Sequence, residues 1–68
     1  MLQSKVDKFV QLAKQSIHQE FKDLDKETVD SMIEKSMIED EIRRKPSIYM
    51  HMTSEQLADR VEDNLSYL

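Results

Sequence analysis

The sequence has no glycine, no cysteine and no tryptophan, and its only proline is Pro46. Glycine makes up about 7% of an average protein, and a chain without it has few residues suited to turns that need a positive φ angle. Without cysteine, neither a disulfide nor a thiolate metal ligand can support the fold. The chain is therefore predicted to be mostly helical.

The chain is also short of core-forming residues. Its 68 residues are 38% hydrophobic and include only two Phe and two Tyr. This length predicts one helical domain over residues 1–68, and such a domain buries only about 60% of its unfolded surface. A lone core of this size rarely supplies more than about 3–5 kcal/mol. We therefore expect either very regular helix packing or association with another chain, which would be a second copy in a homodimer or a partner protein.

Ten basic and fourteen acidic residues give a net charge of −4. This balance argues against binding to duplex nucleic acid, which depends on Lys and Arg neutralising phosphates. No stretch approaches the roughly 18 apolar residues of a membrane-spanning helix, and the N-terminus lacks the apolar run of a signal peptide. We expect a cytoplasmic protein with no direct contact to nucleic acid or membrane.

The first predicted helix covers about residues 2–22. Its apolar residues follow one another at steps of three and four, which places them along one face. They are Leu2, Val6, Phe9, Val10, Ala13, Ile17, Phe21 and Leu24.

A second helix is predicted over about residues 26–44. Asp25 is a suitable N-cap, and Pro46 ends the helix just beyond its last turn. Its apolar face is predicted to contain Val29, Met32, Ile33, Ser36 or Met37, Ile38 and Ile42. Its last turns place an acid four residues before a base three times, a spacing that favours ion pairs. The pairs are Glu39 with Arg43, Asp40 with Arg44, and Glu41 with Lys45.

A third helix is predicted over about residues 54–66. Thr53 and Gln56 have the spacing of a capping box, and Met52 and Leu57 that of a hydrophobic staple. The short link between the first two helices predicts an antiparallel hairpin, so the expected fold class is an all-α small bundle. The third helix either packs across this hairpin or supplies a dimer contact.

Catalytic and metal-binding patterns are weak. His18 and His51 are the only histidines, and their spacing matches no common ligand pair. A nucleophile site usually needs a strained turn or a backbone oxyanion hole, and a phosphate loop needs glycine. We expect no enzymatic activity, no cofactor and no metal.

The best candidate for a functional surface follows Pro46. The segment Ile48, Tyr49, Met50 and Met52 is unusually apolar, and Met is common on adaptable binding surfaces. The segment is either an exposed patch or a loop that folds back over the open end of the hairpin. Tyr67 and Leu68 at the C-terminus are secondary candidates. This pattern predicts a small protein-binding regulator or adaptor that acts through an apolar surface.

Two alternatives use charge instead. An acidic face on the second and third helices would suit an inhibitor that occludes a nucleic-acid-binding protein. Residues Thr53 to Leu65 could also be read as the recognition helix of a DNA-binding helix-turn-helix. Phosphates would repel its exposed acids, so this is the weaker alternative.

Overall fold

The computed structural model describes the backbone of residues 2–67 and the side chains of residues 4–67. Within this range the regular secondary structure is entirely helical, which confirms the predicted all-α bundle. The helices are α1 (Leu2–Glu20), α2 (Lys26–Ser36), α3 (Ile38–Arg44), α4 (Pro46–Tyr49) and α5 (Ser54–Leu65).

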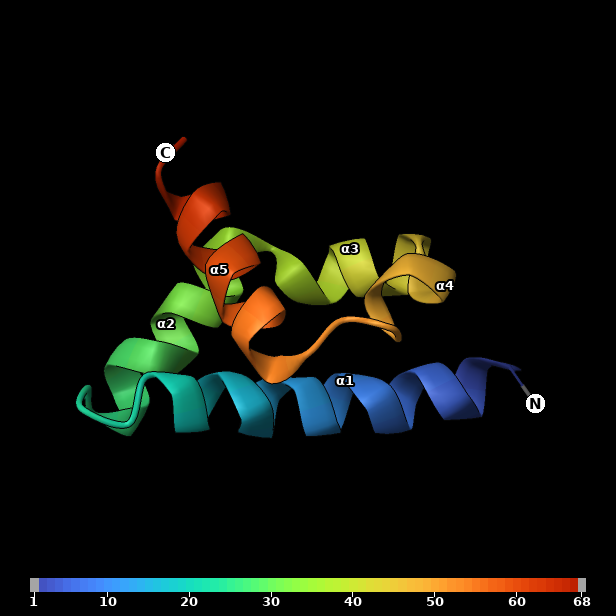
Figure 1. The fold of residues 1–68 in the computed structure, drawn as a ribbon, viewed down its shortest axis with the longest axis horizontal. Coiled ribbons are helices and arrows are strands. Elements are labelled where there is room, and N and C mark those ends of the chain that lie inside the picture. The colour runs from blue at the N-terminus through green and yellow to red at the C-terminus, as the bar shows by residue number, and fades with distance from the viewer. Residues whose placement is uncertain (1, 68) are drawn as a thin grey trace.

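Helix α1 runs along one side of the molecule, and the later helices all lie on the same side of it (Figure 1). The chain leaves α1, rises through α2, and returns above α1 through α3 to the short helix α4. Helix α5 packs most extensively against α1 and also contacts α2. The third predicted helix therefore packs across the other elements of the same chain.

The core lies between α1 and the later helices. Side chains at steps of three and four on α1 are buried, as the apolar pattern predicts. They meet buried side chains from every later helix, and Phe9, Phe21, Met32, Met52 and Leu65 pack partly buried around them. The core cluster comprises Val6, Val10, Ala13, Ile17, Val29, Ile33, Ile38, Ile42, Tyr49, Leu57 and Val61.

The turn between α1 and α2 follows the predicted capping chemistry. Helix α1 ends at Glu20, two residues before the predicted end, and Leu24 lies exposed in the turn. The Asp25 carboxylate accepts a hydrogen bond from the Thr28 amide at 2.9 Å, which confirms Asp25 as the N-cap of α2. This hydrogen bond lowers the pKa of Asp25 below its ordinary value.

The prediction of one continuous helix over residues 26–44 is wrong, because the helix breaks at Met37. Met37 adopts a left-handed conformation with φ 57° and ψ 29°. Ile38 lies nine positions after Val29, and Ile42 lies nine positions after Ile33. At about 100° per residue, a continuous helix would place these two pairs on opposite faces. The break brings all four side chains into one core.

Hydrogen bonds from two polar side chains satisfy the backbone at the break. The buried hydroxyl of Ser36 donates to the Ile33 carbonyl at 2.8 Å and accepts from the Ile38 amide at 3.3 Å. The side-chain amide of Asn64 on α5 donates to the Ser36 carbonyl at 3.0 Å. Of the two alternatives left open by the sequence, Ser36 is buried and Met37 is exposed.

The segment after Pro46 forms one helical turn, α4, with the proline in its first turn. The chain then enters α5 through the predicted capping box. The Thr53 hydroxyl accepts from the Gln56 amide at 3.2 Å, and the Gln56 side chain accepts from the Thr53 amide at 2.9 Å. Met52 before the cap is partly buried and Leu57 after it is buried, so both sides of the cap contact the core.

Replacing Met37 with glycine is expected to stabilise the fold by about 0.5–1 kcal/mol. Left-handed backbone costs a non-glycine residue roughly 1–2 kcal/mol, and the greater freedom of glycine in the unfolded chain offsets part of this gain. Urea unfolding measures the difference. Gln11→Gly in the exposed middle of α1 is the control, and we expect it to destabilise the protein by about 1 kcal/mol. Equal losses in both variants would contradict the assigned strain at Met37.

Candidate functional site

The candidate residues around α4 are divided between the surface and the core. Ile48 is 56% exposed and Met50 is 38% exposed, whereas Tyr49 between them is only 6% exposed. Met52 is partly buried against the core. The apolar surface at α4 therefore consists of Ile48 and Met50, with Tyr49 as the residue that anchors the turn.

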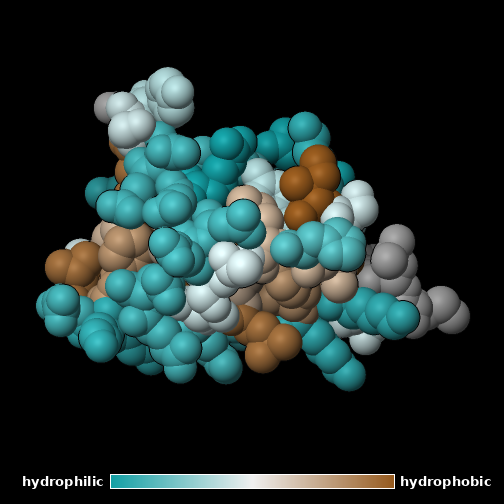
Figure 2. Space-filling view, viewed as in Figure 1, coloured by the Kyte–Doolittle hydropathy of each residue, from teal (hydrophilic) through white to brown (hydrophobic). Residues whose placement is uncertain are grey.

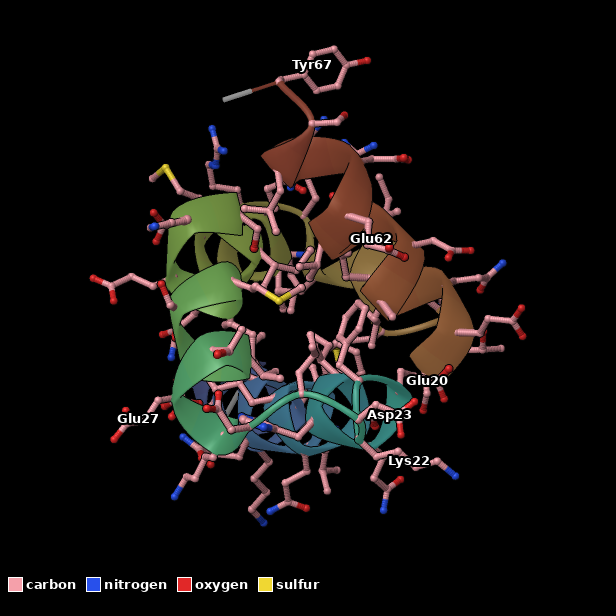
Figure 3. The ribbon with its side chains drawn as sticks, turned by 90° about the vertical axis from the view of Figure 1, so that its left-hand side faces the viewer. Glu20, Lys22, Asp23, Glu27, Glu62 and Tyr67 are labelled. Carbon is pink, nitrogen blue, oxygen red and sulfur yellow. The ribbon has the colours of Figure 1, made fainter. Side chains whose placement is uncertain are left out.

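The C-terminal candidates are separate from this pair. Tyr67 is 88% exposed and projects away from the bundle beyond α5 (Figure 3). Leu68 lies outside the described residues.

The Tyr49 ring is held in place by a polar cluster centred on Glu41. The Tyr49 hydroxyl donates to Oε2 of Glu41. Arg60 on α5 donates to the same oxygen at 3.3 Å, and Asn64 donates to Oε1 at 3.1 Å. One carboxylate on α3 therefore links α4 and α5, and it fixes the position from which Ile48 and Met50 project.

The pKa values of this cluster follow from its hydrogen bonds. Partial burial acts to raise the pKa of Glu41, but the hydrogen bonds from Tyr49 and Arg60 outweigh it and the pKa is lowered overall. Burial and the hydrogen bond to Glu41 raise the pKa of Tyr49. The folded state therefore favours a charged Glu41 beside a neutral Tyr49.

Only one of the three predicted ion pairs within this part of the chain forms. Arg43 lies 3.2 Å from Glu39, as predicted. Among the described residues, no salt bridge joins Asp40 to Arg44 or Glu41 to Lys45. Glu41 instead accepts hydrogen bonds from Tyr49, Arg60 and Asn64. These contacts with residues farther along the chain outweigh the preference for an ion pair four residues away.

Two further ion pairs and one hydrogen bond connect α1 to the two helices that follow it. Lys14 lies 2.8 Å from Glu39, and Asp7 lies 2.5 Å from Arg43, so both pairs join α1 to α3. His18 lies 2.7 Å from Asp30 on α2. No group of three or more His, Cys, Asp or Glu within the described part of the chain is placed to hold a metal ion.

A groove between α1, α2 and α3 is the second feature that could receive a ligand. It has a volume of about 600 Å³. Ile33 forms part of its floor, and the exposed side chain of Met37 lies at the helix break beside it. Its polar lining is mainly acidic and consists of Lys14, Asp30, Glu34, Glu39 and Asp40. The groove forms where the helix breaks. It could not be predicted from the sequence, because the sequence was expected to form a continuous helix there.

The exposed hydrophobic surface is otherwise scattered. Figure 2 shows the most hydrophobic surface on one face as separate patches, divided by hydrophilic side chains. The charged residues labelled in Figure 3, including Glu27 at the start of α2 and Glu62 on α5, also point outward. Within the part of the chain that the structure describes, no helix combines the length and the hydrophobicity needed to cross a membrane.

Searches against protein-family models, curated proteins and solved structures found no match to this chain.

Removing the Tyr49 hydroxyl is expected to destabilise the fold. Tyr49→Phe keeps the buried ring but deletes a hydrogen bond to a carboxylate, and we expect a loss of about 1–2 kcal/mol in the free energy of unfolding. Tyr67→Phe removes a hydroxyl from an exposed ring and should change this free energy by less than about 0.5 kcal/mol. Urea unfolding of both variants tests the anchoring role, and equal effects would contradict it.

Acid is expected to destabilise the protein in part through Glu41. Its pKa is lower in the folded protein than its ordinary value of 4.5. Its stabilising contribution is therefore complete above the unfolded pKa and is lost as the pH falls through the folded value. Urea unfolding of Glu41→Gln at about pH 7 and pH 3 should show a smaller acid-induced loss than the parent. Glu62→Gln, at an exposed position, should retain the parent's loss, and an unchanged loss in Glu41→Gln would contradict this assignment.

Proposed function

We propose that this chain is a small, non-enzymatic protein-binding module that acts as a regulator or adaptor in the cytoplasm. Its proposed contact surface is the exposed pair Ile48 and Met50, and Tyr67 and Leu68 are secondary candidates. The observation that carries this proposal is the alternation around Tyr49, in which two exposed apolar side chains flank a buried one.

The way α4 is held supports this proposal. Tyr49 contributes its ring to the core and its hydroxyl to Glu41, so the short helix is fastened at its last residue. Side chains that project from a fixed turn lose less conformational freedom on binding than side chains on an unsupported loop. Ile48 and Met50 would therefore enter an apolar pocket of a partner with their backbone already ordered.

The contact is small, and this limits the kind of complex that it can form. Two side chains can serve as the centre of an interface, since a few buried residues usually supply most of the binding free energy. The charged residues next to α4, Arg44 and Lys45, are exposed and would lie at the edge of such an interface. Charges there influence orientation and association rate more than affinity.

The test is affinity capture from a lysate of the source cells with three forms of the tagged protein. We expect a partner that the parent and Leu12→Ser retain, and that Ile48→Ser/Met50→Ser loses by at least about tenfold. Leu12 is a matched control because it is an exposed apolar residue on α1. Retention should change little between low and moderate salt because the contact is apolar.

Light scattering on the same proteins separates the two possible kinds of partner. A dimer of the parent that dissociates in Ile48→Ser/Met50→Ser would mean that the partner is a second copy of this chain. Partners that bind all three forms equally, together with an unchanged oligomeric state, would contradict the proposed surface.

A further inference from the structure

We propose that the groove between α1, α2 and α3 binds a basic amphipathic helix from another protein. An apolar residue of that helix would contact Met37, and the cations on either side of it would contact Glu34 and Asp40. This site involves none of the α4 residues, so the inference does not depend on the proposed α4 contact.

The shape of the groove and its apolar residues suit an amphipathic helix. Its volume of about 600 Å³ is sufficient for several side chains. Ile33 contributes to the floor, and Met37 is 57% exposed beside it. Met37 is also the one residue in the described part of the chain that adopts a positive φ angle, and it is not a glycine. An apolar side chain is thus presented to solvent from a strained position, where glycine or asparagine would suit the backbone better.

The charge of the groove favours a basic partner. Four carboxylates and one lysine line the groove, so four negative charges against one positive charge give a net of −3. Two of these carboxylates already have partners, since Asp30 pairs with His18, and Glu39 pairs with Lys14 and Arg43. Glu34 and Asp40 form no salt bridge within the described residues, and both are exposed. They are the two carboxylates best able to pair with cations of a partner.

The acidic and apolar residues of the groove alternate along the sequence. Glu34 and Asp40 lie three residues before and three residues after Met37 in the sequence, and all three residues line the groove. A partner helix with Lys three residues on either side of Leu presents these side chains on one face. Its order of cation, apolar residue and cation complements the order of acid, apolar residue and acid along the sequence of this chain. Amphipathic helices commonly bind in grooves with apolar floors in this way.

The test uses a fluorescein-labelled synthetic helix of about 15 residues, built from Ala with a Lys-Ala-Ala-Leu-Ala-Ala-Lys motif. Two control peptides replace either the Lys residues of the motif with Glu or its Leu with Ala. Fluorescence anisotropy with the full chain at low and moderate salt measures the affinity. We expect the Lys–Leu peptide to bind at least about tenfold more tightly than either control, and more weakly as salt increases.

Variants of the protein then locate the bound peptide. Glu34→Lys/Asp40→Lys should weaken binding by roughly tenfold or more, and Met37→Ala by a smaller factor. Asp59→Lys/Glu62→Lys on α5 changes the net charge by the same amount and should alter affinity by less than about threefold. The neutral variant Glu34→Gln/Asp40→Asn provides a second test if the charge reversal disturbs folding. Ile48→Ser should leave peptide binding unchanged, which keeps this site distinguishable from α4.

Three outcomes would overturn the proposal. The first is no binding of the Lys–Leu peptide up to about 1 mM. The second is an equal loss of affinity in both charge-reversal variants, which would mean attraction to net charge alone. The third is a dimer of the parent that Glu34→Lys/Asp40→Lys dissociates, which would make a second copy of this chain the occupant.

Discussion

The rest of the structure depends on the hydrogen bonds that satisfy the backbone around Met37. Ser36 bonds to the backbone on both sides of the break, and Asn64 donates to the carbonyl that the break exposes. An unsatisfied buried polar group costs about 1–3 kcal/mol of folding free energy, so the helix could not break at this position without these partners. With them, Ile38 and Ile42 join Val29 and Ile33 in one core. A polar arrangement therefore makes the apolar core of this small chain possible.

The same arrangement determines where the surfaces of interest lie. Asn64 also donates to Glu41, so a single side chain on α5 fixes both the end of α2 and the body of α3. Glu41 in turn accepts from Tyr49 and thereby fixes α4. The exposed pair on α4 and the groove beside Met37 are consequences of one break and of the contacts that support it. Networks of this kind favour one arrangement of a small core over its alternatives only when every member is satisfied, and no buried side-chain nitrogen or oxygen within the described residues lacks a partner.

The features that the sequence predicts well are those decided by neighbours along the chain. The Asp25 cap, the capping box of Thr53 and Gln56, and the apolar face of α1 each depend on residues within four positions of one another. The break at Met37 was missed, although the nine-residue offset between the two pairs of apolar residues does not fit one helical face. By contrast, the position of Tyr49 and the absence of the predicted Glu41–Lys45 ion pair follow from the contacts of Glu41. Glu41 accepts hydrogen bonds from Tyr49 and, on α5, from Arg60 and Asn64. The sequence alone does not bring those residues together.

Met37 shows how stability and binding can place opposite demands on one position. Stability favours a residue that accepts a positive φ angle, and an exposed methionine contributes little to the core in return. Binding favours a flexible apolar side chain, which glycine cannot provide, between two carboxylates that form no salt bridge within the described residues. Strained residues persist where the surrounding structure holds them firmly, and they are common at ligand-binding sites. The bonds of Ser36 and Asn64 supply that support here, so the conformation of Met37 is maintained by the fold while its side chain remains free to contact a partner.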